Sequence, residues 1–383
     1  MDSTQITGPN SERDATSLPP AAPFPGSRDL IGGTPAAPRD GRPENGHPLA
    51  GVDVMLAPLC GITDSVFRKV CLDHGADMAV TEMISSEGLV RNSHHVRAVR
   101  DLDMSNGPLS LQIFGSDPET MGEAAAILSE LEPHYLDMNF GCPVRKIVSK
   151  NGGSAMLRDV KHLNRVCRRV VERSRVPVSA KIRSGWDKPS AESLRDIGRA
   201  IEDAGVSMVA IHARTRKQAF KGKANWLLIK TMKEAVSIPV VGNGDVTGPE
   251  SYFELKAQTG CDAVMVGRGA IGNPWIFGEI KAAIEQRDYR PPTHRERVQG
   301  LLAHVKLSVQ RLGEPTGLIV LRKIMAAYLK RLPNARGLRG QLMTCERIEA
   351  LEALLDTYLR ELDESDTPAA TQTPEEATLP SAC

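Results

Sequence analysis

A single cysteine in a tight turn is the first candidate for chemistry in this sequence. Cys142 lies in the stretch Asn139-Phe140-Gly141-Cys142-Pro143, directly after the apolar run 134–138. Gly141 and Pro143 favour a turn, so the thiol is displayed where a strand should end. A thiol with an ordinary pKa of about 8.5 is mostly protonated at neutral pH and can donate a proton. A lone cysteine is more often a small buried apolar side chain, so the choice depends on the residues around it.

Other short apolar runs also end in polar or turn-forming residues. In a barrel of parallel strands the carboxyl ends lie on one face, and the active site is built there. The strand interiors are apolar, so polar side chains at nearly every strand end indicate a site rather than a surface. In chain order these residues are Pro58, Glu82, Gln112, Asn139 with Cys142, Lys181 with Arg183, His212, Asn243 and Arg268.

Glycine pairs follow the last two runs and indicate a phosphate site. Gly242/Gly244 and Gly267/Gly269 would let backbone amides approach a phosphate closely, and barrels often bind phosphate after strands seven and eight. Arg268 would add a charged contact. Either pair alone could simply form a tight turn, but both lie at the expected strands.

Three further side chains suit a flavin. Lys181 could stabilise the negative charge of a reduced isoalloxazine ring, and the Gln112 amide could bond its pyrimidine edge. His212 could bond the flavin or a substrate. In isolation Lys181 could equally be a solvated or paired charge, and His212 a structural histidine.

The elements that must position these residues alternate along the chain. Eight β-rich runs are separated by amphipathic stretches with helical spacing, including 118–130, 160–173, 191–204 and 226–236. Eight strands, each followed by a helix, predict a (β/α)8 TIM barrel of the α/β class. A doubly wound sheet is the alternative, but no GxGxxG turn follows the first run. The runs are 52–58, 78–82, 109–115, 134–139, 177–183, 207–213, 238–243 and 262–267.

Composition divides the chain into four regions. Residues 1–48 are rich in Pro, Gly, Ser, Asp and Arg, which predicts a disordered N-terminal extension. Residues 49–290 hold the barrel. Residues 291–362 contain three helical stretches with no strand between them and predict a small helical domain. Residues 363–383 resemble a disordered acidic tail.

Charge and cysteine usage exclude several classes. The 383 residues carry a net charge of +1, so no global field announces a nucleic-acid partner. The seven cysteines show no zinc spacing, which argues against a metal and for a reducing compartment, and Cys60, Cys71, Cys167 and Cys261 read as structural. Neither a membrane span nor a signal peptide is evident, so we expect a cytoplasmic protein.

Taken in order, these motifs resemble the tRNA-dihydrouridine synthases, and most closely the bacterial branch of that family. The resemblance covers about residues 50–350 without a gap, apart from Phe140, where many relatives have another residue. The N-terminal extension lies outside the family pattern. The segments that carry the resemblance are 55–64, 111–115, 138–143, 181–183, 212–215, 242–245, 267–269 and 273–277.

The resemblance implies an FMN-binding TIM barrel with a C-terminal helical domain, acting as a monomer. The implied reaction is NADPH-dependent reduction of the C5–C6 bond of a tRNA uridine to 5,6-dihydrouridine. Cys142 would be the general acid that protonates C5, while Asn139 and Arg183 would hold the uracil, which must be flipped out of the RNA stack. The residues that would bind FMN are Pro58, Gln112, Lys181, His212, Asn243, Gly244, Gly267 and Arg268.

The helical region carries a local positive charge that suits tRNA. Residues 293–347 contain eleven Lys and Arg against three Asp and Glu. Arg322, Lys323, Lys330 and Arg331 recur at i, i+1, i+8 and i+9, and we expect them to share one helix face that contacts phosphates, with Arg336 and Arg339 in the following loop. A solvated helix face is the alternative.

Two other functions remain open at this point. An FMN barrel acting on a small pyrimidine, similar to dihydroorotate dehydrogenase, would share the phosphate site, Lys181 and the cysteine, but would not need the basic helices. An RNA-binding protein that kept a barrel without chemistry would not need Gln112, Cys142, Lys181 and His212 together.

Overall fold

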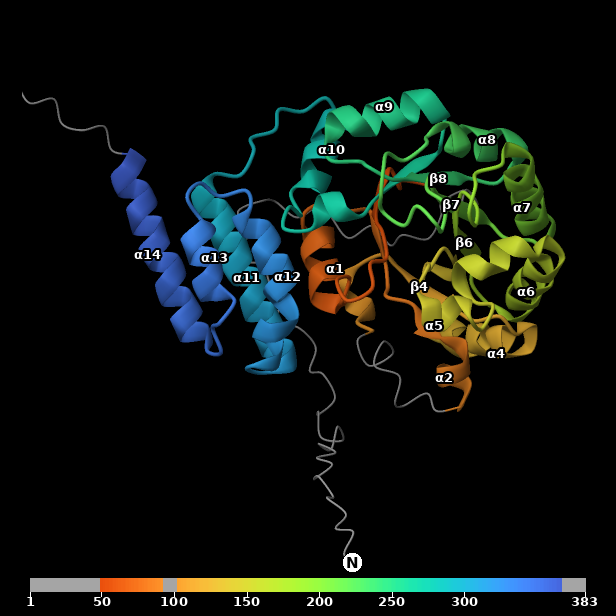
Figure 1. The fold of residues 1–383 in the computed structure, drawn as a ribbon, viewed down its shortest axis with the longest axis horizontal. Coiled ribbons are helices and arrows are strands. Elements are labelled where there is room, and N and C mark those ends of the chain that lie inside the picture. The colour runs from red at the N-terminus through yellow and green to blue at the C-terminus, as the bar shows by residue number, and fades with distance from the viewer. Residues whose placement is uncertain (1–48, 92–101, 367–383) are drawn as a thin grey trace, which may run out of the picture.

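Eight parallel strands close into a barrel in the computed structural model, which describes residues 49–91 and 102–366. The order is β2-β1-β9-β8-β7-β6-β5-β4, and β4 also pairs with β2. Figure 1 shows the barrel, with β4, β6, β7 and β8 labelled. The predicted (β/α)8 barrel is confirmed. Each predicted run overlaps one strand, and only β5 extends past its run, by the single residue Phe140. The strands are β1 (Val54–Leu56), β2 (Met78–Val80), β4 (Leu109–Phe114), β5 (Tyr135–Phe140), β6 (Val178–Arg183), β7 (Met208–His212), β8 (Val240–Asn243) and β9 (Ala263–Val266).

The second strand of the barrel is interrupted once. β3 (Ile84–Ser85) follows β2 and also pairs with β4, with Ile84 opposite Ile113, whereas β2 places Ala79 opposite Leu109. The second strand therefore holds one more residue than β4 over this stretch, as in a β-bulge. Glu82, which we predicted at a strand end, lies in the interruption.

Helices wrap the outside of the barrel, and side-chain caps begin several of them. Asp64 accepts a hydrogen bond from the backbone N–H of Phe67, and Asp159 accepts one from that of His162. The helices around the barrel, capped or not, are α1 (Ser65–Asp73), α2 (Ser86–Arg91), α4 (Pro118–Ser129), α5 (Arg145–Val148), α6 (Val160–Arg173), α7 (Ala191–Asp203), α8 (Leu227–Ala235), α9 (Pro249–Thr259) and α10 (Ile276–Ile284). Short 3-10 turns lie at Met104–Asn106, Gly153–Arg158 and Arg268–Ala270.

Two apolar cores hold the barrel, and the smaller one fills its interior. Met55, Met78, Tyr135, Met208 and Met265 belong to this interior cluster and are almost fully buried. The larger cluster lies between strands and helices and continues into the C-terminal helices. Residues two apart on a strand share a face, so the polar side chains at the strand ends lie above the interior core.

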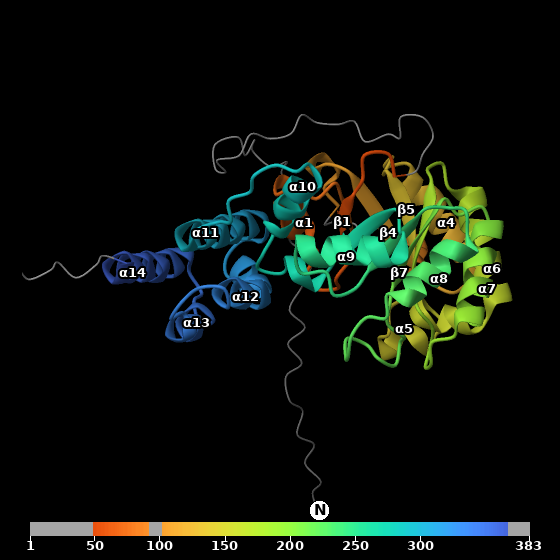
Figure 2. The same ribbon diagram turned by 90° about the horizontal axis from the view of Figure 1, so that it is seen from above.

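Up to residue 366, where the described part of the chain ends, four helices follow the barrel rather than three, and they lie to one side of it (Figure 2). Our prediction that Arg336 and Arg339 lie in a loop is wrong, because both lie in the additional helix α13. The helix α14 runs past our boundary at residue 362. The helices are α11 (His294–Leu312), α12 (Thr316–Leu329), α13 (Arg336–Leu342) and α14 (Ile348–Asp366).

Our predictions of disorder for residues 1–48 and most of 363–383 lie outside the described residues. Among the residues that are described, no helix combines the length and the apolar character needed to cross a membrane.

The helical domain packs tightly on the turn after β9. The ring of Trp275 meets that of Tyr328 edge-on, with centroids 6.0 Å apart, and the Arg297 guanidinium lies 5.3 Å from the Trp275 ring centroid. Gly272 has a φ of +65°, and a Cβ there would lie 2.4 Å from the backbone nitrogen of Tyr328 and 2.5 Å from the carbonyl carbon of Ala327. Gly272 is therefore required both for its backbone conformation and for the approach of α12.

We expect Gly272→Ala to lower the free energy of unfolding by about 2 kcal/mol or more, because backbone atoms cannot yield to the added methyl group. Thermal unfolding measures the effect as a lower Tm. Gly340→Ala in α13 is the matched control, since no heavy atom lies within 4 Å of the added Cβ and the helix should gain stability. Equal Tm values for Gly272→Ala and the native protein would contradict the tight interface.

Candidate active site

The polar side chains predicted at the strand ends are lateral neighbours in the barrel. Strand register places Asn139 beside Lys181, Arg183 beside His212, and His212 beside Asn243. Gln112 on β4 is beside Asp137 on β5. Most of these polar side chains are buried. Burying a polar or charged group costs free energy unless the group pairs with another side chain or with a ligand.

A chain of hydrogen bonds links three of the strands to the Cys142 loop. Ser179 Oγ donates to Asp137 Oδ1 (2.6 Å), and Gln112 Nε2 donates to Asp137 Oδ2 (2.6 Å). Asn139 Nδ2 donates to Gln112 Oε1 (2.7 Å). Asn139 Oδ1 in turn accepts from the backbone N–H groups of Gly141 (3.1 Å) and Cys142 (2.9 Å). Asp137 is a member of the site that sequence reasoning missed.

The Cys142 loop is also held from its other side. The Cys142 carbonyl accepts hydrogen bonds from the backbone N–H (3.0 Å) and the hydroxyl (2.9 Å) of Ser154. Gly153 has a φ of +56°, and a Cβ there would lie 2.7 Å from the Cys142 carbonyl oxygen. The loop conformation therefore depends on contacts on both sides of the cysteine.

The Cys142 thiol is protonated at neutral pH. Its side chain is 9% exposed, and burial raises the pKa of the thiol, with a nearby Cys60 acting in the same direction and Arg183 opposing it. A protonated thiol can donate a proton. Cys71, Cys167 and Cys261 are buried, whereas Cys60 is exposed in a turn, so burial supports the structural interpretation for the first three and not for Cys60.

Lys181 is buried, and its ammonium group has a pKa close to neutral pH. Its Nζ donates to Asn243 Oδ1 (3.1 Å), and Asn243 Nδ2 donates to the Met265 carbonyl (2.7 Å). Burial and the charge of Arg183 lower the pKa of Lys181 to about 8, whereas Asp137 opposes them. An anionic ligand beside Lys181 would favour its charged form.

Arg183 ties two loops together. Its Nε donates to the Gly141 carbonyl (2.8 Å), and its Nη1 donates to the carbonyls of Thr215 (3.1 Å) and Ala219 (2.9 Å). The guanidinium thus joins the Cys142 loop after β5 to the loop after β7, which is a contact that sequence reasoning did not foresee.

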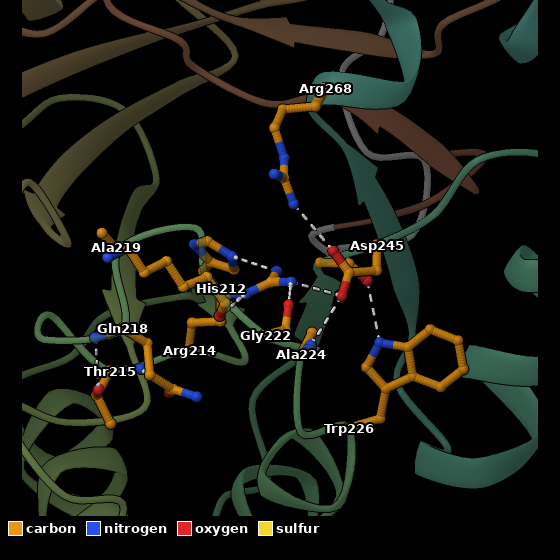
Figure 3. A network of polar contacts seen from close by, with 12 residues as sticks. His212, Arg214, Thr215, Gln218, Ala219, Gly222, Ala224, Trp226, Asp245 and Arg268 are labelled. Atoms are coloured by element: carbon orange, nitrogen blue, oxygen red, sulfur yellow. Dashed lines mark hydrogen bonds and ion pairs between the residues drawn. The ribbon is translucent and has the colours of Figure 1, made fainter.

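A second cationic cluster lies around His212 (Figure 3). Asp245 accepts from Arg214 Nη2 (2.7 Å), Arg268 Nη2 (3.0 Å) and the backbone N–H of Ala224 (2.8 Å). Burial lowers the pKa of His212 to about 2, with help from the charges of Lys181, Arg183, Arg214 and Arg268. His212 is therefore neutral. Of the four cations that act on it, Asp245 pairs with Arg214 and Arg268, and the remaining positive charge favours an anionic ligand.

The glycine turns beside this cluster fit a phosphate. Within the described part of the chain, the backbone N–H groups of Gly244 and Gly267 have no hydrogen-bond acceptor. Gly244 has a φ of +134°, and a Cβ there would lie 2.8 Å from that of Ala224. The ideal Cβ of Gly267 would lie 3.7 Å from Leu59, so this turn adjoins the loop that contains Pro58. Free N–H groups among arginines match phosphate oxygens.

Two rings flanked by arginines lie on the same loops and were also missed. Phe220 is 49% exposed, with the guanidinium carbons of Arg183 and Arg268 at 5.6 Å and 5.2 Å from its ring centroid. Trp186 lies in the same way between Arg158 and Arg216. The basic run 216–223 around Phe220 is the sequence signal that could have identified this surface.

The four cations predicted on one helix face are separated in the structure. α12 ends at Leu329, so Lys330 and Arg331 lie at and beyond its end. Partial burial and the charge of Glu82 raise the pKa of Cys60, and the charge of Lys323 opposes this rise, so Lys323 faces Cys60. The charge of Arg322 instead opposes the rise in the pKa of Cys345, and the charge of Arg331 helps to lower the pKa of Arg297. The prediction of a shared face is wrong.

Comparisons with known proteins agree with this arrangement. A family model described as "Dihydrouridine synthase (Dus)" matches residues 55–363. The tRNA-dihydrouridine synthase B of Pseudomonas aeruginosa is 37% identical over 318 residues, covering 83% of this chain and 96% of that protein. Its counterpart in Shewanella oneidensis is 37% identical over 310 residues (81% and 96%), and a probable tRNA-dihydrouridine synthase of Aquifex aeolicus is 36% identical over 303 residues (78% and 93%). The chain belongs to the dihydrouridine synthase family.

Proposed function

We propose that this protein is a tRNA-dihydrouridine synthase that uses FMN, with NADPH as reductant, to reduce the C5–C6 bond of a tRNA uridine. The observation that carries the proposal is the protonated Cys142 thiol, held in a loop beside buried cations at the carboxyl ends of the strands. This combination supplies a proton donor and an anion-binding environment in one place.

The residues present fit FMN. The N–H groups of Gly244 and Gly267, with Arg268, suit its phosphate, while Lys181 and the remaining Nε2 hydrogen of Gln112 suit carbonyl oxygens of its ring. When bound, FMN supplies the hydride that the uracil receives at C6. His212 is neutral and lies beside Asn243 in strand register, so it can complete the cofactor site as a hydrogen-bonding group.

Cys142 supplies the proton that C5 receives. Asn139 has both lone-pair directions of its Oδ1 occupied by backbone N–H groups, so it offers a substrate only its second Nδ2 hydrogen. That hydrogen suits a uracil carbonyl oxygen and not an amino group. Arg183 holds the two loops on either side and leaves part of its guanidinium for the same base.

The purified protein tests the cofactor assignment. We expect a yellow protein whose flavin is released as FMN on denaturation and is bleached by NADPH under anaerobic conditions. A colourless protein that binds tRNA would favour an RNA-binding protein without chemistry. A yellow protein that reduces free uracil or orotate and not tRNA would favour the small-pyrimidine enzyme.

Among the α12 cations we favour Lys323 for contact with tRNA, because its charge acts on Cys60, which in turn lies near Cys142. We expect Lys323→Glu to weaken tRNA binding and to reduce the slope of log K against log salt by about 1, as for the loss of one phosphate contact. Arg331→Glu, beyond the end of α12 and near Arg297, is the matched control and should have the smaller effect. Affinities at several salt concentrations measure both, and equal losses for the two variants would contradict the assignment.

A further inference from the structure

Asp137 is a buried carboxylate that the proposed reaction does not itself require. It lies on β5 among the side chains that point into the barrel, and it is 3% exposed. Burial raises the pKa of Asp137, while the hydrogen bonds from Gln112 and Ser179 and the charge of Lys181 oppose this shift. A buried carboxylate is retained at a cost unless its contacts serve the site.

The groups at the two ends of the hydrogen-bond chain determine how the Gln112 and Asn139 amides between them are oriented. At one end, the two carboxylate oxygens of Asp137 accept from Ser179 Oγ and from Gln112 Nε2, so Gln112 turns its Nε2 toward Asp137. At the other end, the backbone N–H groups of Gly141 and Cys142 can only donate, so Asn139 must present its Oδ1. The remaining contact, from Asn139 Nδ2 to Gln112 Oε1, then follows.

We propose that Asp137 is a positioning residue that fixes the orientation of the Gln112 and Asn139 amides and thereby holds the Cys142 loop for proton transfer. The inference rests on the proposed function for its role in catalysis, but the hydrogen-bond chain itself does not. Without an acceptor at position 137, the Gln112 amide can reverse and offer its own N–H to Asn139. Asn139 must then reverse too, which would set its Nδ2 against the backbone N–H of Cys142.

The loop would then be held from one side only. Ser154 would still bond the Cys142 carbonyl, but the backbone N–H of Cys142 would lose its acceptor. We therefore expect the loss of Asp137 to expose the Cys142 thiol while the barrel remains folded. A network of this kind is stronger than its separate bonds, so one end controls the other.

Alkylation of the protein as purified, with iodoacetamide and peptide mapping by mass spectrometry, tests the proposal without relying on activity. Cys60 is exposed and serves as the internal reference in every sample. We expect Asp137→Leu to raise the alkylation rate of Cys142 about tenfold relative to that of Cys60. Asp137→Asn should stay near the native rate, because an asparagine can turn its oxygen to Gln112 and its amide to the Ser179 hydroxyl, which can accept.

The matched control is Asp77→Asn. Asp77 is a carboxylate near the amino end of the barrel that accepts from the backbone N–H groups of Asp53 and Val54 and pairs with Lys281. Asp77→Asn should leave the Cys142 rate unchanged. If Asp137→Leu does not fold, Gln112→Met breaks the same chain with the carboxylate in place and should give the same increase.

In the active enzyme, Asp137→Leu should lower kcat for dihydrouridine formation about tenfold with an unchanged KM for tRNA, and Asp137→Asn should restore it. An unchanged Cys142 rate in both Asp137→Leu and Gln112→Met would overturn the proposal. So would an Asp137→Asn protein as reactive as Asp137→Leu, since the charge and not the acceptor would then matter. If native protein forms no dihydrouridine but the alkylation results hold, the proposed function fails and the positioning role stands.

Discussion

The Cys142→Ala variant should form dihydrouridine in tRNA about 10²–10⁴-fold more slowly than the native protein, with unchanged reduction of its flavin by NADPH. The thiol is protonated because of its burial, and in the proposed reaction it supplies only the C5 proton. Stopped-flow absorbance under anaerobic conditions separates the two half-reactions, because flavin bleaching by NADPH precedes its reoxidation by tRNA.

Cys60→Ala is the control for the loss of a thiol at this location. Cys60 lies near Cys142 but is exposed, and its removal should change neither half-reaction more than about twofold. If Cys142→Ala reoxidised with tRNA at the native rate, another residue would have to be the acid. If both half-reactions slowed together, Cys142 would act on the cofactor site instead.

Lys181→Met should weaken FMN binding to the cofactor-free protein by about tenfold or more, because a buried charge-assisted contact to an anionic ligand is lost. The native affinity should depend on pH with a defined sign. The pKa of Lys181 is lowered to about 8, so its ammonium is charged below pH 8 and loses its proton above it. FMN affinity should therefore fall as the pH rises through about 8, and the Lys181→Met protein should lack this step.

Fluorescence titration with FMN between pH 6.5 and pH 9.5 measures both effects, since protein binding quenches or shifts flavin emission. The control variant is Lys281→Met at the other end of the barrel, where Lys281 pairs with Asp53 and Asp77. That variant should keep the native pH step. A Lys181→Met protein with native affinity and the same pH step would exclude a role for Lys181 in flavin binding.

The barrel could be predicted because parallel strands buried on both faces produce continuous apolar runs separated by capped helices. Seven of the eight barrel strands lie within predicted runs, β5 extends past its run by one residue, and α6 has the predicted bounds Val160–Arg173. The bulge between β2 and β3 could not be predicted, since one extra residue leaves the local pattern unchanged and shows only in the pairing with β4.

Helix α13 was missed for a specific reason. Its sequence contains Gly337 and Gly340, which disfavour a helix by up to about 1 kcal/mol each. Leu338 and Leu342, four residues apart, are buried against the neighbouring helices and stabilise it. Tertiary packing therefore decides the structure of this segment, and local propensity does not.

At the site, residue types were predictable and partners were not. Strand ends identified Gln112, Asn139, Lys181 and His212, because position on a strand follows from sequence. The link through Asp137 depends on register between strands far apart in the chain. The predicted face shared by Arg322 and Arg331 failed because α12 ends at Leu329, which leaves Arg331 outside the helix.

Dihydrouridine in unmodified tRNA, measured by mass spectrometry after incubation with the purified protein, FMN and NADPH, is the most direct test of the proposed function. We expect dihydrouridine to appear at a discrete uridine, to require NADPH, and to be lost with Cys142→Ala. Oxidation of NADPH with no dihydrouridine in any tRNA, together with reduction of free uracil or orotate, would contradict it.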